Sequence, residues 1–374
     1  MKILFLSYAE SHSIKWVNAL CDRGHQVYFV IQKNVVNKKA DVNKKIKIFE
    51  LPFEGKKGYI LNSYALKKLV KKIDPDVVNV HYASGYGTMA RLAGIKKELL
   101  SVWGSDVYDF PYKNRFCMYI IKKNLLHAKQ IASTSNCMAS QVKKIIYDKK
   151  KITVTPFGID IEKFSPERFK EKSDATIVIG NIKVISPKYG IDDLIKAFEL
   201  LRKDLLSTEG NKYIAQKIRC VIYGPGEQRD ELIKMVKDKG LEEYIKFPGE
   251  IEANEVPEKL SGIDIFCATS VLDSESFGVS VVEAEAMEIP VVVTDVDGFR
   301  EVVEDGITGI IVKRRNINEI YMALKKLVLD EELRHKMGKN GRKRVIEKYN
   351  FEDNVTIMEK IYFDIAKDKY ERNM

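Results

Sequence analysis

Residues 275–287 read Glu-Ser-Phe-Gly-Val-Ser-Val-Val-Glu-Ala-Glu-Ala-Met, and this stretch says most about the fold and the function of the chain. It begins as a turn-like segment, passes through Phe277 and Gly278, and continues as an apolar helical pattern. Glycine lets a backbone approach a ligand closely, and the positive end of a helix attracts phosphate. Carboxylates beside such an end, here Glu275 and Glu283, accept hydrogen bonds from sugar and ribose hydroxyls. The stretch therefore predicts a site for a sugar nucleotide.

On both sides of this stretch, the chain repeats a short apolar strand followed by an amphipathic helix. This rhythm is typical of parallel sheets that helices cover on both faces. In the first half we expect strands at 3–7, 26–30, 46–50, 77–81, 99–102, 130–134 and 152–155, with helices at 13–23, 63–73 and 118–127. In the second half we expect strands at 176–180, 219–223, 245–247, 263–267, 291–294 and 309–312.

A break in this rhythm predicts the domain boundary. The turn-rich segment 156–166 and the charged run 167–174 interrupt the alternation of strands and helices. We therefore expect one domain at 1–165 and a second at 166–350. The helical pattern at 351–374 follows the second domain.

The composition is that of a globular protein. A chain of 374 residues with 45% apolar and 31% charged residues suits two domains. No run of 18 apolar residues occurs, and the short apolar start predicts a first strand instead of a signal peptide. The five cysteines are scattered without metal-ligand spacing, which favours a reduced, cytoplasmic protein.

The positive charge is concentrated in the first half of the chain. Residues 1–165 hold 29 Lys and Arg against 13 Asp and Glu, whereas the remainder holds 34 against 40. The expected helix at 63–73 and the segment 112–129 both mix basic with apolar side chains. This pattern favours docking on an anionic membrane surface. A general solubility charge and two ordinary amphipathic helices on a sheet are the alternatives.

The spacing of the two glutamates and the motifs that follow them resemble those of a known enzyme family. Seven residues separate Glu275 from Glu283, Pro290-Val-Val-Val-Thr294 follows, and Gly298-Phe-Arg-Glu301 comes next. In these features the chain resembles the retaining, nucleotide-sugar-dependent glycosyltransferases of family 4, the group 1 type. The resemblance implies the GT-B fold, an α/β architecture of two Rossmann-like domains with a cleft between them. It also implies that the helix at 351–374 crosses back to the first domain.

The reaction that the resemblance implies is the transfer of a hexose or N-acetylhexosamine. The donor would be a nucleoside diphosphate sugar, with a UDP-sugar expected first and a GDP-sugar second, and no other cofactor. The acceptor would be a glycan or a polyprenyl-linked glycan in cell-surface polysaccharide, lipopolysaccharide or glycolipid biosynthesis. The enzyme would retain the anomeric configuration and work without a metal, in the cytoplasm and peripherally on the inner face of the cell membrane.

On the donor side, the resemblance assigns roles to residues of the second half. Lys183 stands where the family has an arginine, Lys188 keeps the family's spacing five positions later, and both would neutralise the diphosphate. Glu275 would bond the donor sugar and Glu283 the ribose. Backbone groups around Phe277, Gly278 and Val279 would complete the donor site. The Asp-x-Asp string at 295–297 has the form of a metal motif, but we expect no metal there.

On the acceptor side, the resemblance points to His81 and Asp106. His81 ends an expected strand and would bond a hydroxyl of the transferred sugar. Asp106 would assist the acceptor hydroxyl, with a loop-capping role as the alternative. Trp103 replaces the histidine that the family usually has in this segment, which leaves the function of that position open.

Two rival functions remain at this stage. One is another GT-B enzyme, such as a sugar-nucleotide epimerase or a phosphorylase. The other is a basic nucleic-acid-binding protein, which only the net charge of +10 suggests. No nucleic-acid-binding motif supports it, so we expect no nucleic-acid partner.

Overall fold

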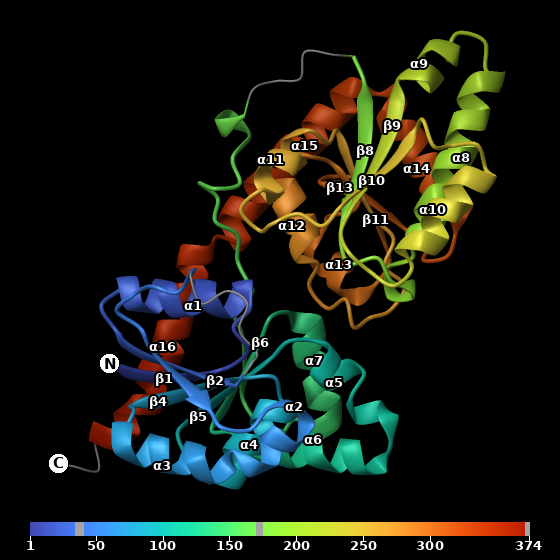
Figure 1. Ribbon diagram of the computed structural model, residues 1–374. Coiled ribbons are helices and arrows are strands. Elements are labelled where there is room, and N and C mark those ends of the chain that lie inside the picture. Colours follow the sequence, from blue (N-terminus) through green and yellow to red (C-terminus); the bar gives the residue numbers. More distant parts are fainter. Residues whose placement is uncertain (34–40, 170–174, 371–374) are drawn as a thin grey trace. The chain divides into compact units, whose positions relative to one another are not determined.

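The computed structural model describes residues 1–33, 41–169 and 175–370 (Figure 1). The chain divides into two compact units. Unit 1 comprises Met1–Phe157 and the segment from Glu352 onward, and unit 2 comprises Gly158–Phe351. The boundary that we expected after residue 165 lies slightly later than this division. The charged run at 167–174, where we place the linker between the domains, falls partly on 170–174, outside the described residues.

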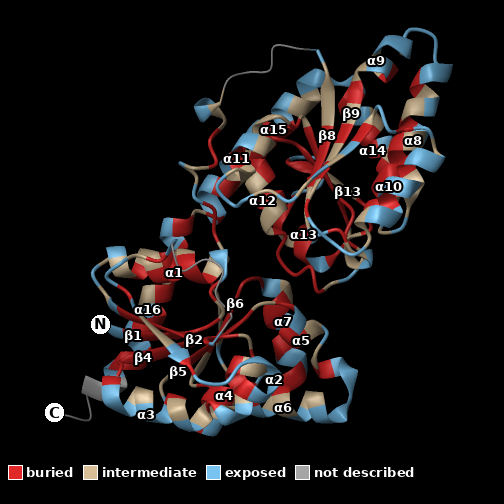
Figure 2. Ribbon diagram, in the orientation of Figure 1, coloured by how far each residue is buried: buried red, intermediate tan, exposed pale blue. Residues whose placement is uncertain are grey.

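Unit 1 is built on a seven-stranded parallel sheet in the order β3-β2-β1-β4-β5-β6-β7. The strands are β1 (Lys2–Leu6), β2 (Gln26–Gln32), β3 (Lys47–Leu51), β4 (Val77–His81), β5 (Glu98–Val102), β6 (Gln130–Ser133) and β7 (Ile152–Val154). The central strands are buried along their whole length, because helices cover both faces of the sheet (Figure 2).

The helices of unit 1 form a layer on each face of this sheet. They are α1 (Ser11–Asp22), α2 (Gly55–Leu61), α3 (Ser63–Ile73), α4 (Gly85–Ala93), α5 (Ser105–Tyr108), α6 (Arg115–His127) and α7 (Asn136–Ile146), with a short 3-10 helix η2 (Pro111–Lys113). Figure 1 shows α2, α3, α4 and α6 along one side of the sheet and α1 on the other. Helix α4 packs against α2, α3 and α6.

The last helix, α16 (Phe351–Tyr370), packs within unit 1 from Glu352 onward. Arg23 at the end of α1 bonds Glu352 at 2.7 Å and Glu359 at 2.6 Å. The Tyr362 side chain is fully buried and accepts a hydrogen bond of 2.8 Å from the Asn79 amide of β4. The C-terminal segment is thus part of the core of unit 1.

Unit 2 is built on a six-stranded parallel sheet in the order β10-β9-β8-β11-β12-β13. Its strands are β8 (Ile177–Ile182), β9 (Ile218–Tyr223), β10 (Ile245–Gly249), β11 (Ile265–Ala268), β12 (Val291–Thr294) and β13 (Gly309–Val312). Its helices are α8 (Ile191–Ser207), α9 (Lys212–Lys217), α10 (Arg229–Asp238), α11 (Val256–Ser261), α12 (Val279–Ala286), α13 (Asp297–Val302), α14 (Ile317–Leu329) and α15 (Glu331–Lys348), with 3-10 helices η3 (Pro166–Arg168) and η4 (Pro187–Tyr189).

The expected fold class is confirmed: each half of the chain forms a parallel α/β sheet of the Rossmann type. Every strand expected from the sequence is present as a strand. The reason is that strands of a parallel sheet are covered on both faces and therefore consist of short, continuous apolar runs. In both sheets the strand order reverses at the centre, between β1 and β4 and between β8 and β11. Ligands of such sheets bind beyond the carboxyl ends of the strands at this reversal.

A buried acid lies where α12 packs on α15. Glu285 of α12 is fully buried, since Gly341 of α15 has no side chain to keep the helices apart and a Cβ there would lie 3.2 Å from the Glu285 side chain. Burial raises the pKa of Glu285 to about 8, against the opposing effects of the Thr308 hydroxyl and Arg344. Glu285 therefore binds a proton in the folded chain that the unfolded chain releases near pH 4.5.

This difference predicts a pH-dependent contribution to stability. Between about pH 4.5 and 8 the folded state holds one proton more than the unfolded state, so the free energy of unfolding falls by about 1.4 kcal/mol per pH unit from this group. Glu285→Gln removes the titrating group and keeps the shape of the protonated acid. Denaturant unfolding at several pH values should show that the variant has the larger free energy of unfolding, and that its advantage over the wild type grows up to pH 8. An advantage independent of pH would contradict the prediction.

Among the helices of the described residues, none has the length and apolar character needed to cross a membrane.

Candidate functional site

The predicted donor residues lie at the carboxyl edge of the unit 2 sheet. Lys183 directly follows β8, and Glu275 lies in the loop that leads from β11 into α12. These two strands are neighbours at the reversal of strand order. The fold therefore brings together two segments that the sequence separates by about ninety residues, at the position where open α/β sheets bind ligands.

An ion pair joins the two segments. Lys183 Nζ lies 2.8 Å from Glu275 Oε2, and the Glu275 side chain is 8% exposed whereas the Lys183 side chain keeps 23% exposure. Burial lowers the pKa of Lys183, but the opposing charges of Glu275 and Glu283 and the Tyr189 hydroxyl outweigh it, so its pKa is raised. The ammonium stays charged, and it lies within electrostatic reach of both predicted glutamates.

The second lysine lies beside the same aromatic ring as the first. Lys183 Nζ is 4.8 Å and Lys188 Nζ 5.4 Å from the centre of the Tyr189 ring. The Val271 N–H donates to the Lys188 carbonyl at 2.9 Å, which joins the segment after β8 to the segment after β11. Two cations thus lie close to one ring at this edge of the sheet.

The N-terminal end of α12 has no side-chain cap. Gly278 precedes the helix with φ 84°, a conformation that side chains rarely adopt, and a Cβ there would lie 2.7 Å from the Phe299 ring. Phe277 is 2% exposed and packs edge-on against Tyr349, so its ring belongs to the core. The first N–H groups of α12, beginning at the half-buried Val279, point out of the helix end.

Glycines allow the backbone segments around this edge to pack closely. A Cβ at Gly224 would lie 2.0 Å from the Lys183 carbonyl oxygen, and one at Gly226 would lie 2.0 Å from that of Ile185. A Cβ at Gly298 would lie 2.3 Å from the Glu275 carbonyl oxygen. The Gly-Pro-Gly turn therefore packs directly against the backbone of the Lys183 segment, and Gly298 packs directly against the backbone of the Glu275 loop.

Arg314, just after β13, holds two neighbouring loops in place. Its guanidinium bonds the Asp273 carboxylate at 3.0 Å, the Asp295 carboxylate at 3.0 Å and the Val271 carbonyl at 3.3 Å. Asp273 lies two residues before Glu275, in the same loop. Because a guanidinium presents its donors in a fixed fork, this contact fixes both the position and the orientation of the loop.

The Asp-x-Asp string is part of this arginine network. Asp295 accepts from Arg314 and lies 3.4 Å from Arg300, which together lower its pKa although burial opposes them. The Asp297 N–H donates to Asp273 at 3.2 Å. Within the described part of the chain, no three His, Cys, Asp or Glu side chains are grouped to hold a metal ion.

In unit 1, His81 ends β4 and is 1% exposed. The Asn79 amide donates to His81 Nε2 at 3.2 Å, so the neutral ring carries its proton on Nδ1. That Nδ1 is buried and has no hydrogen-bond partner among the described residues. Burial lowers the pKa of His81 to about 3, and the nearby His12 adds to this effect. His81 is therefore a neutral donor that finds no acceptor in the described part of the chain.

Aromatic rings surround His81. Trp103 lies 4.7 Å from the His81 ring and 5.4 Å from Phe157, measured between ring centres. Tyr82, next to His81, has φ 70°, which is unusual for a bulky residue and often marks a functional site. A cavity of about 10 Å³, close to the volume that one water molecule needs, is lined by His81, Trp103 and Thr134.

Asp106 is buried and engaged with backbone groups. Its carboxylate accepts from the N–H groups of Ala83 at 2.7 Å, Gly104 at 2.9 Å and Trp103 at 3.1 Å. Burial raises the pKa of Asp106, while these N–H groups oppose the rise. The carboxylate thus joins the loop after β4 to the loop after β5. This contact is the loop-capping role that we gave as the alternative for Asp106. Its action on an acceptor stays a prediction.

Comparisons with known proteins agree with this architecture. Residues 163–344 match the model of the glycosyl transferases group 1, and residues 2–135 match that of the glycosyl transferase 4-like domain. The chain belongs to the group 1 glycosyltransferases. The family resemblance inferred from the paired glutamates is thereby confirmed.

The similar proteins extend over nearly the whole chain. N-acetyl-α-D-glucosaminyl L-malate synthase of Bacillus anthracis is 23% identical over 93% of this chain and 92% of its own length. UDP-Gal:α-D-GlcNAc-diphosphoundecaprenol α-1,3-galactosyltransferase of Escherichia coli is 26% identical over 82% of this chain and 79% of its own.

Solved structures of the GT-B fold are also similar to this glycosyltransferase. Sucrose-phosphate synthase from Thermosynechococcus elongatus aligns with a TM-score of 0.82 at 16% identity, over 98% of this chain and 100% of that one. HepE of Anabaena, in complex with UDP-glucose, aligns with a TM-score of 0.75 at 18% identity, over 99% and 100%. The GT-B fold inferred from the sequence is thereby confirmed.

Three contributors to the site were not found from the sequence. Tyr189, Arg314 and Asn79 are not among the residues that the sequence pattern indicates. Arg314 follows the carboxyl end of an expected strand and Asn79 lies near the end of another, so strand-end position was the available signal. Their partners, Asp273 and Tyr362, are distant in sequence and have no shared motif.

The low pKa of His81 predicts that its ring stays neutral throughout the physiological range. In NMR spectra of histidine-labelled enzyme, the His81 signal, assigned by its loss in His81→Asn, should not shift between pH 5 and 8. The other four histidines provide comparison signals in the same sample. A titration midpoint for His81 inside this range would contradict the prediction.

The Arg314 network predicts that Arg314→Lys slows sugar transfer. The ammonium cannot make the forked contact, so the loop that carries Glu275 shifts, and we expect kcat to fall about ten-fold or more. Arg315→Lys is the matched control, because Arg315 pairs with Asp192 and Asp193 at the start of α8 and does not contact the loop. Steady-state kinetics and melting temperatures of both variants check this. Equal effects of the two substitutions would refute a positioning role.

Proposed function

We propose that this glycosyltransferase moves a hexose or N-acetylhexosamine from a nucleoside diphosphate sugar to a glycan or lipid-linked glycan, with retention of configuration, in cell-surface polysaccharide or glycolipid biosynthesis. One observation carries the proposal. The charged Lys183, 2.8 Å from Glu275 and within reach of Glu283, lies at the sheet edge where the uncapped α12 begins. Family membership supplies the reaction class.

The leaving group explains the need for cations. Negative charge grows on the nucleoside diphosphate as the bond to the sugar breaks, and preorganised positive groups lower the energy of that state. Lys183 and Lys188 both lie close to the Tyr189 ring, and both would neutralise the diphosphate. The first N–H groups of α12 would add directional hydrogen bonds. In this proposal these groups neutralise the diphosphate without a metal.

The two glutamates would divide the sugar and the ribose between them. Glu275 is buried and held by Lys183, so its carboxylate is fixed in place to accept from hydroxyls of the donor sugar. Glu283 lies about one turn into α12, is half-buried, and would accept from the ribose. The ammonium of Lys183 has three donors and can bond both Glu275 and a phosphate oxygen.

The residues of unit 1 would act on the transferred sugar and on the acceptor. His81 has a neutral ring with an Nδ1–H that no described residue accepts, which suits a hydrogen bond to a sugar hydroxyl. Asp106 would act on the acceptor hydroxyl if the bound acceptor displaces one of its backbone donors. Otherwise Asp106 shapes the loop that carries Trp103.

The similar proteins guide the choice of donor and acceptor. The name of the E. coli relative specifies UDP-galactose as donor and a diphosphoundecaprenol-linked acceptor, and the HepE structure contains UDP-glucose. We therefore place UDP-sugars first among donors and polyprenyl-linked glycans first among acceptors, with GDP-sugars second. Such acceptors lie in a membrane, and we propose that the enzyme works on the cytoplasmic face of one as a peripheral protein.

The test is a transfer assay with labelled UDP-sugars and GDP-mannose and a polyprenyl diphosphate-linked glycan. Lys183→Gln, Lys188→Gln and Glu275→Gln should each lower kcat/KM about ten- to a hundred-fold, as expected for the loss of one charged hydrogen bond. Lys203→Gln is the control, since it removes the same charge from an exposed position where Lys203 pairs with Glu199. Activity near wild type in all three site variants would defeat the site assignment.

Three further readouts test the finer parts of the proposal. Product NMR should show the anomeric configuration of the donor, and an inverted product would overturn retention alone. Added chelator should leave the rate unchanged, and a loss restored by a divalent cation would overturn metal independence. Conversion of the nucleotide sugar without any acceptor would favour an epimerase.

A further inference from the structure

Unit 1 has a surface hollow at the edge of its sheet opposite to His81. It has a volume of about 280 Å³ and lies between α3 and the segment that leads into β5. Asp74 and Pro75 precede β4, and Gly94 to Lys97 precede β5, so the hollow lies at the amino ends of the strands whose carboxyl ends carry His81 and Trp103. The hollow is therefore separate from the candidate catalytic site.

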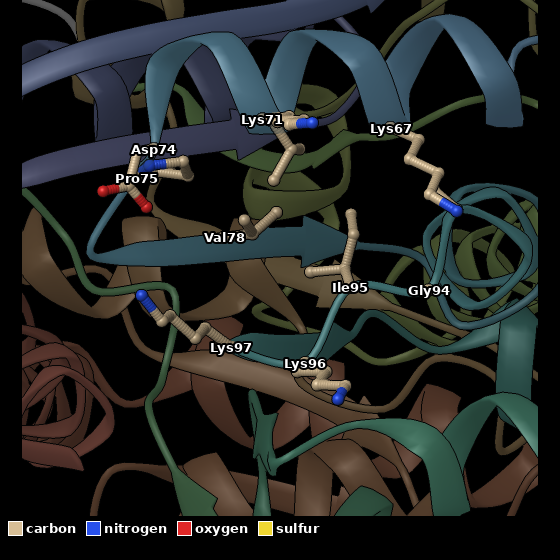
Figure 3. A pocket seen from close by; sticks show the side chains of 11 residues that line it. Lys67, Lys71, Asp74, Pro75, Val78, Gly94, Ile95, Lys96 and Lys97 are labelled. Carbon is tan, nitrogen blue, oxygen red and sulfur yellow. The ribbon is translucent and has the colours of Figure 1, made fainter. Parts of the chain in front are cut away.

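Four lysines surround this hollow. Figure 3 shows Lys67 and Lys71 extending from α3 on one side and Lys96 and Lys97 from the facing segment on the other. Among the described residues, Lys67, Lys71 and Lys96 are exposed and have no ion-pair partner. Asp74 is the one acidic side chain among the described residues that line the hollow. The rim thus carries an excess of positive charge that suits an anion.

The floor of the hollow is apolar. It is formed by Val70, Pro75, Val78, Ala93 and Ile95. A free inorganic anion would leave this floor unused, because it offers no carbon to cover it. A nucleotide base would stack on an aromatic ring, and no lining residue is aromatic. The combination suits a phosphate group that is bonded to a short carbon backbone, such as a glycerophosphate head group.

Helices α2, α3 and α4 carry large apolar side chains that face solvent. Tyr64, one turn before Lys67 on α3, is 66% exposed, Ile60 and Leu61 of α2 are 59% and 51% exposed, and Leu92 beside the hollow is 46% exposed. Amphipathic surfaces of this kind insert apolar side chains at a bilayer boundary while lysines meet the head groups. This observation favours a lipid over a soluble phosphate.

The same helical layer extends toward the other edge of the sheet. Helix α4 packs against both α3 and α6, and α6 begins soon after the short helix α5, which contains Asp106. On α6, Phe116 is 70% and Tyr119 57% exposed. A membrane that contacts this layer would therefore reach from the hollow to the side of unit 1 where a lipid-linked acceptor would be bound.

We propose that the hollow binds the phosphodiester head group of an anionic phospholipid, and so fixes the orientation of unit 1 on the membrane. The proposal rests on the proposed function in one respect, namely the peripheral membrane location of the enzyme. It adds a specific phosphate site of Lys67, Lys71 and Lys96 over an apolar floor, distinct from the donor and acceptor sites. No covalent step is involved.

The test is flotation of the full-length protein with vesicles of phosphatidylcholine, with and without one-fifth phosphatidylglycerol. The pocket variant replaces Lys67, Lys71 and Lys96 by Gln. The matched control replaces the exposed Lys56, Lys57 and Lys72, which lie on α2 and α3 outside the hollow. If the attraction to the membrane were diffuse, the loss of three charges would weaken vesicle binding equally in both variants. We expect instead that the pocket variant binds anionic vesicles at least about ten-fold more weakly than the control. Equal binding by the two variants would overturn the proposal.

Competition distinguishes a lipid head group from a free phosphate. Dihexanoyl phosphatidylglycerol, kept below its micelle concentration, should displace the wild-type protein from vesicles, and the same concentration of inorganic phosphate should not. Equal displacement by both would overturn the lipid as the ligand. Melting temperatures check that the variants are folded.

Donor binding separates this proposal from the proposed function. The pocket variant should keep the rise in melting temperature that UDP-sugars give the wild type. Vesicle binding that depends on the hollow, in a protein that binds no nucleotide sugar, would sink the proposed function and leave the head-group site standing. Donor binding without any preference for anionic vesicles would overturn the head-group site and leave the proposed function standing.

Discussion

Parallel strand pairing is the constraint on which the candidate site depends. In a parallel sheet all carboxyl ends lie at one edge, so the segments after β8, β11, β12 and β13 meet there although they are far apart in sequence. Lys183, Glu275, Asp295 and Arg314 come from these four segments. Each is a charged side chain that would be costly to bury within the sheet, and at the edge each finds an opposite charge. The ion pair of Lys183 with Glu275 is the most buried of these contacts in the site.

The parts of the fold that the sequence predicted are those with a local signal. Short apolar runs of three to five residues located the strands, because a strand covered on both faces needs apolar residues on both. The paired glutamates and Gly278 could be assigned because their spacing along one short helix is a local pattern. For Gly278 the structure also supplies the physical reason, a positive φ in contact with the Phe299 ring.

What could not be predicted depends on contacts between distant residues. Asn79 orients His81 and is itself held by Tyr362, which lies 283 positions later in α16. Nothing in either local sequence indicates this pair. The role of Gly224 was equally hidden, since a glycine in a turn and a glycine pressed against the Lys183 carbonyl look the same in a sequence. For Asp106 the sequence left two roles open, and the structure shows the three backbone donors that hold its carboxylate.

In the proposed function, the lysine at position 183 would shift the task of orienting the donor to the backbone. A guanidinium, which the family resemblance leads one to expect there, would grip two phosphate oxygens in a defined plane, whereas an ammonium supplies charge with little direction. Glu275 fixes where that charge lies, but it cannot fix the rotation of a bound diphosphate. Directional hydrogen bonds would then have to come from the first N–H groups of α12. The backbone beside those groups is closely packed, because Gly278 lies against Phe299 and Gly298 lets α13 approach the Glu275 loop. The tight glycine contacts would therefore matter more for donor orientation here than in a relative that keeps the arginine.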